Sequence, residues 1–290
     1  MELSIVSQSI LYFCIAFYVL FIPLELFVQI KMLKGQKIPK PDGSIDQIET
    51  FPEFFAYAIG NLFLLLPVVI VSIILVLLSH RIGFYLMALV SFWMVFNYFC
   101  RTAVSFKVYT PKLNLKWIFV FPWYAVVGLT YIIWSVVHFS IIYPVSQVEK
   151  LSLMARIILY VIMAVYAVVV VGLFDYQYKV VKRKVPVLPG AEPDDWHKYP
   201  VLYGGGLADV LINCPTVIIG LILILFNYWL GYYLVAMATS ILIWCIGFIF
   251  FEIKFHKPKI TFMWFVSFVL PPLVGLAFLI WTLVYFDAIY

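Results

Sequence analysis

The stretch "PVVIVSIILVLLSHRIGFYLMAL" (67–89) returns later in the chain as "PTVIIGLILILFNYWLGYYLVAM" (215–237), at an offset of 148 residues (215 − 67 = 148). Each copy consists of two apolar runs joined by a short polar connection. Proline, glycine, tyrosine and alanine fall at matching positions, which is more specific than shared hydrophobicity. The two copies predict a tight hairpin of membrane helices that is present twice.

The composition extends this prediction to the whole chain. Of the 290 residues, 66% are hydrophobic and only 11% are charged, whereas soluble domains have about 25% charged residues. Eight apolar runs reach the length of about 20 residues that a transmembrane helix needs. These runs are 5–30, 54–79, 82–105, 117–142, 153–178, 206–227, 229–252 and 262–287.

The first apolar run is expected to be a membrane span. It has no basic region before it and no small-residue cleavage site after it, which are the marks of a signal peptide. The match between the halves also continues beyond the hairpins, because Gln29 pairs with Gln177 at the same offset. After a slip of one residue, Trp134 pairs with Trp281.

These matches predict an all-α polytopic membrane protein, with eight transmembrane helices arranged as two parallel four-helix repeats. The repeats would comprise residues 1–146 and 147–290. Because four helices return the chain to its starting side, both repeats would have one orientation and a pseudo-two-fold axis along the membrane normal.

Basic residues are concentrated in alternate loops. The loops around 31–40, 101–116, 179–198 and 254–259 carry 16 of the 19 Lys and Arg residues. The positive-inside rule predicts that these loops are cytoplasmic and that both termini are outside the cell or lumenal. We expect no nucleic-acid partner, since the charges are divided among short loops between spans.

Metal and cofactor chemistry has no motif in this sequence. The four cysteines lie in apolar runs and form no CxxC pair, and the four histidines are scattered without a metal-binding spacing. We therefore expect neither a metal site nor a cofactor.

Ionisable residues inside membrane helices are the first functional candidates, because burying a charge there costs a few kcal/mol or more. They are Glu25, Arg101, Asp175, Asp209 and Glu252. Some of these residues also have a purely structural explanation. Asp175 can pair with Lys179 at i+4 and snorkel to the interface, and Arg101 is an ordinary residue for a cytoplasmic boundary.

Asp209 begins a polar strip. Asn213 and Thr216 follow at i+4 and i+7, which places the three side chains on one helix face. Pro215 frees a backbone carbonyl beside that face. We expect Asp209 in the first turn of its helix, where the helix dipole favours an acid. Asn61 occupies the matching position of the first half.

Two segments resemble the EXPERA domain, a four-helix membrane unit. They are "IPLELFVQIK" (22–31) and "DVLINCP" (209–215), the second with an acid, an amide at i+4 and a proline at i+6. The domain occurs in the sterol Δ8-Δ7 isomerase, in the sigma-2 receptor and, as two units, in the transmembrane 6 superfamily. The resemblance implies an intramembrane pocket for a sterol-like or amphipathic amine ligand.

The sequence departs from that family in three ways. The acid of the family's first helix falls on Gln29 and Gln177, which are amides. The histidine and paired glutamate of the isomerase have no counterpart here. The predicted orientation is also opposite to that of family members whose first loop faces the lumen.

The leading hypothesis is a module that binds a lipid, sterol-like or amphipathic amine molecule within the membrane. Its candidate site residues are Asp209, Asn213, Thr216, Asp175, Gln177, Glu25, Gln29, Asn61 and Arg101. The expected partners are membrane lipids and a lipophilic small molecule, and the oligomeric state stays open.

Other functions also fit the sequence. A transporter would have a cavity between the repeats, lined by Asp209, Glu25 and Arg101, and a structural subunit would have no cavity. Whether the protein is an enzyme stays open as well. A sterol or isoprenoid isomerase needs a proton donor and acceptor, and Asp209 with Asp175 is the carboxylate pair that we would assign to these roles.

Overall fold

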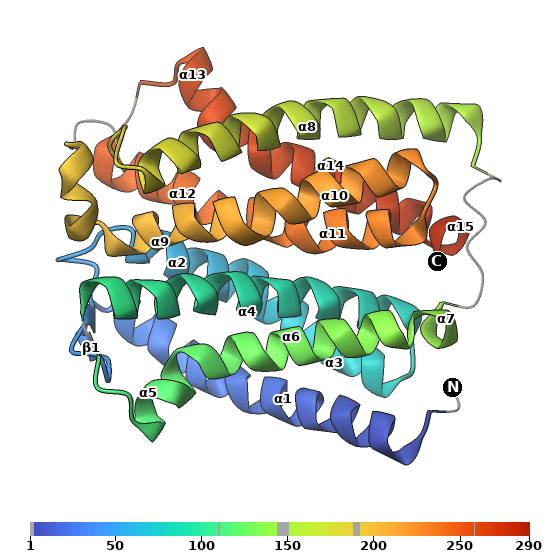
Figure 1. The fold of residues 1–290 in the computed structure, drawn as a ribbon, viewed down its shortest axis with the longest axis horizontal. Coiled ribbons are helices and arrows are strands. Elements are labelled where there is room, and N and C mark those ends of the chain that lie inside the picture. Colours follow the sequence, from blue (N-terminus) through green and yellow to red (C-terminus); the bar gives the residue numbers. More distant parts are fainter. Residues whose placement is uncertain (1–2, 110, 144–150, 188–191, 258) are drawn as a thin grey trace.

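The computed structural model describes residues 3–109, 111–143, 151–187, 192–257 and 259–290. Long helices run side by side along the molecule (Figure 1). Seven of them are long and apolar enough to cross a membrane. They are Ile5–Leu33, Phe54–Leu77, Arg81–Val108, Leu153–Val181, Pro200–Leu225, Trp229–His256 and Phe262–Val284. The chain is thus an all-α polytopic membrane protein.

The first part of the chain, up to residue 143, contains two short strands besides its helices. Its elements are α1 (Ile5–Leu33), β1 (Ile38–Pro39), β2 (Ile45–Asp46), α2 (Phe54–Gly60), the π-helix η1 (Asn61–Leu65), α3 (Leu66–Leu77), α4 (Arg81–Val108), α5 (Leu115–Val120), α6 (Pro122–Val137) and α7 (Phe139–Ile142). The strands pair antiparallel, with Ile38 opposite Asp46. They form a small hairpin in the loop after α1.

The described residues after 150 are also mainly helical. Their elements are α8 (Leu153–Val181), the 3₁₀ helix η3 (Pro193–Lys198), α9 (Pro200–Ala208), the π-helix η4 (Asp209–Asn213), α10 (Cys214–Leu225), α11 (Trp229–Trp244), α12 (Ile246–Phe251), the π-helix η5 (Glu252–His256), α13 (Phe262–Trp264), the π-helix η6 (Phe265–Val269), α14 (Leu270–Val284) and α15 (Phe286–Ile289).

Prolines explain three of the π-helical segments. η1, η4 and η6 each end two residues before a proline, at Pro67, Pro215 and Pro271. A proline has no N–H, and its ring clashes with the carbonyl four residues earlier. A π turn relieves this by pairing residues five apart. The N–H of Leu66 accordingly bonds to the carbonyl of Asn61, and the N–H of Cys214 to that of Asp209.

The eighth expected span, 117–142, is interrupted. It is divided into α5, α6 and α7, and its longest piece, α6, has 16 residues, fewer than the roughly 20 of an unbroken crossing. The break falls at Phe121, directly before Pro122, and α6 ends at Val137. The prediction of eight long helices is therefore replaced by seven and a broken one.

The span expected at 206–227 begins earlier, at Pro200. Proline is favoured at the first helical position because the N–H it lacks would have no helical partner there. Asp209 is therefore nine residues into the span and lies in η4 rather than in the first turn. The helix N-terminus that was expected to favour its negative charge is therefore not beside it. The prediction that Asp209 lies in the first turn of its helix was wrong.

α4 and α11 form the centre of the bundle and pack against each other. α4 is the most enclosed of the seven helices. Its Trp93 and Tyr85 are almost fully buried, as is Tyr233 of α11. In the spans Ile5–Leu33, Leu153–Val181 and Phe262–Val284, only a minority of the residues are buried, as expected of helices that face lipid.

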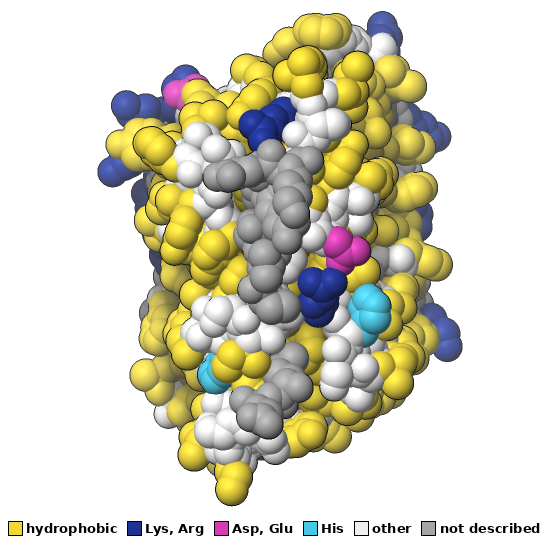
Figure 2. All heavy atoms as spheres, turned by 90° about the vertical axis from the view of Figure 1, so that its right-hand side faces the viewer, with side chains coloured by type: hydrophobic (Ala, Val, Ile, Leu, Met, Phe, Trp, Pro, Cys, Tyr) yellow, Lys and Arg dark blue, Asp and Glu magenta, His cyan; other side chains and the backbone are white. Residues whose placement is uncertain are grey.

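The two ends of the bundle differ in charge. The ends of α1, α4 and α8 and the loop before α13 lie together at the left of Figure 1, and these segments include the basic loops. Both termini and α7 lie at the right. Figure 2 faces that right-hand end and shows few charged side chains on a mostly hydrophobic surface.

Candidate functional site

A buried carboxylate lies between three helices of the bundle. Glu25 of α1 is 6% exposed, and its Oε1 accepts two hydrogen bonds. The Nε2 of Gln29 donates one at 2.6 Å, and the Nδ2 of Asn61, the first residue of η1, donates the other at 2.5 Å. The Nε1 of Trp244 donates to the Oδ1 of Asn61 at 2.8 Å. We call these four residues the Glu25 cluster.

Trp244 joins the Glu25 cluster from α11, far along the sequence. A Cβ on Gly60 would lie 2.5 Å from the indole Nε1, so the absence of a side chain at 60 lets the ring approach Asn61. Sequence reasoning missed this residue. A buried tryptophan N–H usually needs a hydrogen-bond partner, and this was the available signal. It does not identify Asn61 as that partner.

The second half has a smaller polar cluster. The Nδ2 of Asn213 donates to the Oδ1 of Asp209 at 3.0 Å, and the two residues are 1% and 9% exposed. α8 passes close by, because a Cβ on Gly206 would lie 2.6 Å from the Oε1 of Gln177. We call Asp209 and Asn213 the Asp209 cluster, with Gln177 beside it.

The two clusters share one hydrogen-bonding pattern. In each, a carboxylate accepts from the amide four residues later in the same span. In each, the oxygen of that amide is buried without a partner among the described residues, namely Gln29 Oε1 and Asn213 Oδ1. Neither Glu25 nor Asp209 takes part in the ion pairs that the described residues form. In each site, the unpaired amide oxygen is therefore an acceptor for which the described residues supply no donor.

Two of the expected site residues point elsewhere. The hydroxyl of Thr216 donates to the carbonyl of Ile212 in its own helix at 2.7 Å. The exposed side chain of Asp175 pairs with Lys179 at 2.6 Å, as the structural explanation predicts. Asp175 does not share the buried cluster of Asp209, so these two carboxylates do not form the pair considered for an isomerase.

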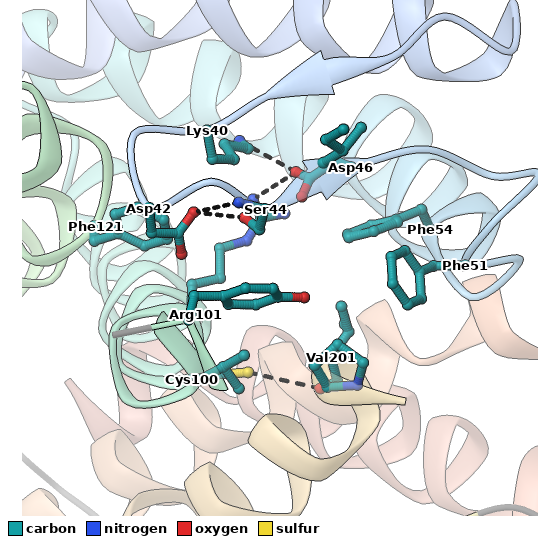
Figure 3. Close-up of a pocket in the computed structure, with 14 residues that line it drawn as sticks. Lys40, Asp42, Ser44, Asp46, Phe51, Phe54, Cys100, Arg101, Phe121 and Val201 are labelled. Atoms are coloured by element: carbon teal, nitrogen blue, oxygen red, sulfur yellow. Dashed lines mark hydrogen bonds and ion pairs between the residues drawn. The ribbon is translucent and has the colours of Figure 1, made fainter. Parts of the chain in front are cut away.

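Arg101 lies in a charged pocket at the basic end (Figure 3). Its Nη1 is 3.2 Å from the Oδ2 of Asp46, and the Nζ of Lys40 is 3.1 Å from the same oxygen. The guanidinium also lies over the rings of Tyr57 and Tyr98. Arg101 thus neutralises Asp46 beside the hairpin of β1 and β2, a pairing that sequence reasoning missed.

The pocket around Arg101 is too small for a lipid. Its volume is about 40 Å³, enough for roughly three water molecules, whereas ligand pockets have about 300–1,000 Å³. Glu25, Asp209 and Arg101 each bond to a different partner. No direct hydrogen bond or ion pair joins these three residues in the described structure, although Glu25 is close enough to Arg101 to interact with it electrostatically.

Glu53 makes stability depend on pH. It directly precedes α2, is 1% exposed, and its Oε1 has no partner among the described residues. Burial raises the pKa of this carboxyl from 4.5 to about 7. The folded protein holds a proton that the unfolded chain releases, so the free energy of unfolding falls as pH rises from about 4.5 to about 7.

We therefore expect Glu53→Gln to be more stable than the wild type at pH 8, by roughly 3 kcal/mol, and to match it near pH 4.5. Thermal unfolding in detergent between pH 4.5 and 8 measures this. Parallel pH profiles for the two proteins would contradict the assignment.

Comparisons with family models, with curated proteins and with solved structures find no match to this chain. Its class therefore rests on the fold, and the seven apolar helices define an integral multi-pass membrane protein. Within the described residues, no group of three or more His, Cys, Asp or Glu side chains is placed to hold a metal ion.

Proposed function

We propose that this protein binds, within the membrane, a lipophilic molecule that carries a protonated amine or a hydroxyl group. One observation carries the proposal: each half buries a carboxylate beside an amide oxygen for which the described part of the chain provides no partner. A ligand ammonium or hydroxyl would supply the missing donor. The resemblance to the EXPERA domain favours the same class of ligand.

The electrostatics support a cationic ligand in particular. A carboxylate in an apolar bundle lacks the solvation that water gives, so a nearby opposite charge stabilises it strongly. The amide oxygen adds a second acceptor without adding a second charge. A hydrogen bond to a charged group contributes about 1.5–3 kcal/mol, which is enough to orient an otherwise apolar molecule.

We further propose that the chain consists of two parallel four-helix repeats, residues 1–146 and 147–290. Element bounds support this. α1 and α8 differ by 148 residues at both ends (153 − 5 and 181 − 33). The π-helices η1 and η4 differ by the same 148 residues (209 − 61 and 213 − 65).

Hydrogen bonds inside each half support the same offset. The hydroxyl of Tyr18 bonds to the Oγ of Ser91 at 2.6 Å, and the hydroxyl of Tyr166 bonds to the Oγ1 of Thr239 at 3.1 Å. Adding 148 to 18 and 91 gives 166 and 239. The first and third spans are thus tied together in the same way in both halves.

Contacts between the halves support a two-fold axis. Tyr85 of the first half bonds to the Oγ1 of Thr282 at 2.9 Å, and Tyr233 of the second half bonds to the Oγ of Ser135 at 3.1 Å. Tyr85 and Tyr233 are 148 residues apart (233 − 85), and Ser135 and Thr282 are 147 apart (282 − 135). An axis that exchanges the halves produces such reciprocal pairs.

In this arrangement the broken helix of α5, α6 and α7 is the eighth crossing. Residues 115–142 would extend about 42 Å as a helix, at 1.5 Å per residue, more than the roughly 30 Å of the hydrocarbon core. Its counterpart in the second half is the continuous span Phe262–Val284.

Asp209→Asn tests the binding proposal. We expect it to weaken binding of a lipophilic tertiary amine by about 1–3 kcal/mol, roughly 5- to 150-fold, because it removes the charge of the hydrogen-bonding partner. Binding is measured by ligand-induced thermal shifts on the purified protein, with the amine and, separately, with cholesterol. The asparagine should fit, since Asn61 occupies the matching position.

Asp175→Asn is the matched control, because this exposed carboxylate already pairs with Lys179. It should leave the amine-induced shift unchanged. Equal shifts in wild type and Asp209→Asn, for both ligands, would remove Asp209 from the site.

We also propose that the basic end is cytoplasmic, with both termini on the other side. A cysteine at exposed Lys184 and one at exposed Ser79 mark the two ends. In intact cells, an impermeant maleimide should label Ser79→Cys and not Lys184→Cys. Labelling of Lys184→Cys alone would establish the opposite orientation.

A further inference from the structure

A serine and a histidine meet at the end of the bundle opposite the basic loops. The Oγ of Ser7 in α1 lies 2.8 Å from the Nε2 of His138, and the Nδ1 of His138 lies 2.8 Å from the carbonyl oxygen of Trp134. A carbonyl only accepts hydrogen bonds, so Nδ1 carries the proton and Nε2 presents its lone pair. The Ser7 hydroxyl donates to that lone pair.

The second half makes the same helix contact without this pair. The indole Nε1 of Trp134 donates to the carbonyl of Ser7 at 3.0 Å, and the Nε1 of Trp281 donates to the carbonyl of Ala155 at 3.1 Å. Ala155 stands at the position of Ser7 (155 − 7 = 148), where no side-chain hydroxyl exists. Tryptophan-to-carbonyl bonding therefore suffices to join these helices, and the serine and histidine are an addition of the first half.

Ser7 lies in the first turn of a long helix, where free backbone N–H groups are available. The N–H of Ser7 donates to the side chain of Ser4, and the N–H of Gln8 donates to the backbone carbonyl of Ser4. The N–H groups of Ile5 and Val6 precede the first helical hydrogen bond and point out of the helix end. Together with the helix dipole, they favour negative charge developing next to Ser7.

The surroundings of the pair are apolar and accessible. Ser7 and His138 are both half-buried, and their chain neighbours Val6 and Val137 are each 69% exposed. An acyl chain in the bilayer can therefore lie against these side chains. Glu25 is 18 residues further along α1, roughly 27 Å away at 1.5 Å per residue, so this site is separate from the Glu25 cluster.

We propose that Ser7 and His138 are a nucleophile and general base that act on the acyl group of a lipid ester at this face of the membrane. The pair has the geometry that activates a serine hydroxyl, with the base held by a third group, here the Trp134 carbonyl. This is a second activity, independent of amine binding at the clusters.

The reaction balances with water as co-reactant. The Ser7 Oγ bonds to the ester carbonyl carbon while His138 Nε2 takes the hydroxyl proton. The C–O bond to the alcohol breaks, and His138 returns that proton to the departing alkoxide. Water then attacks the acyl-serine while His138 takes one of its protons. The bond between the acyl carbon and Ser7 Oγ breaks, His138 gives that proton to Ser7 Oγ, and the fatty acid leaves.

A fluorophosphonate probe tests the pair, because it labels serine nucleophiles that a base activates. Purified full-length protein in lipid nanodiscs should react, and mass spectrometry should place the adduct on Ser7. We expect Ser7→Ala to abolish labelling and His138→Gln to slow it at least 100-fold, the usual contribution of a general base. Ser9→Ala is the control, since its exposed hydroxyl bonds to the carbonyl of Ile5 in the same helix; it should label like the wild type.

A second variant separates chemistry from folding. Ser7→Ala with His138→Tyr installs the residues found at the matching positions of the second half, Ala155 and Tyr285. It should keep the wild-type Tm and the amine-induced shift while losing all labelling. The proposal would be overturned if the probe labelled a reference serine hydrolase but not the wild-type protein. Full labelling of His138→Gln would overturn it as well.

Discussion

Glu25→Leu is expected to lower the free energy of unfolding by about 2–6 kcal/mol. The change leaves the buried amide groups of Gln29 and Asn61 without an acceptor, and each unsatisfied buried donor costs about 1–3 kcal/mol. Asn61 would also hold Trp244 less firmly, since its orientation depends on both hydrogen bonds. Leucine itself fits this helix, as Leu173 stands at the matching position of α8.

Chemical unfolding in mixed micelles measures the loss, with Glu25→Gln as the control. Glutamine keeps an oxygen acceptor at the same place, so it should lose much less stability than leucine. If both variants unfold like the wild type, the hydrogen bonds of the Glu25 cluster do not hold the helices together.

Gly247→Ala is expected to destabilise the protein by about 3 kcal/mol, the upper part of the usual range for overpacking. Gly247 is in α12, and a Cβ there would lie 2.3 Å from the carbonyl oxygen of Ala56 in α2. A backbone atom cannot rotate aside as a side chain can. The two helices must therefore separate, and they join the two halves at the basic end.

Gly205→Ala provides the matched comparison. A Cβ at that helical position would meet nothing within 4 Å, so alanine should stabilise α9 by up to about 1 kcal/mol through its better helix propensity. Tm values of the two purified variants should move in opposite directions. A stable Gly247→Ala would mean that α2 and α12 do not pack this closely.

The apolar runs made most of the spans predictable, because a membrane requires length and hydrophobicity that sequence displays directly. Local structure around prolines was not predictable. Pro67 and Pro215 follow π turns inside continuous spans, whereas Pro122 follows a break at Phe121. Each of the three prolines lacks the backbone N–H that a helix would use, yet the chain adapts in two different ways, so the proline alone does not predict the outcome.

The candidate site was visible in part for a similar reason. Glu25 and Asp209 stand out because acids in apolar runs are rare, and their amides four residues later follow from helix periodicity. Trp244 and Asp46 did not stand out. Their contacts with Asn61 and Arg101 connect segments far apart in sequence, and only the packing of the bundle brings them together.

The reciprocal bonds of Tyr85 and Tyr233 carry a consequence for how such a chain can evolve. Two identical copies of a four-helix unit could have made both bonds, as a homodimer, before any fusion. In a homodimer every mutation appears twice, so both sites must serve one purpose. Joining the copies in one gene removes that restriction, and each half is then free to specialise. Under the proposed two-repeat arrangement, such divergence would account for Glu25 with Gln29 in one half, Asp209 with Asn213 in the other, and the serine–histidine pair of the first half.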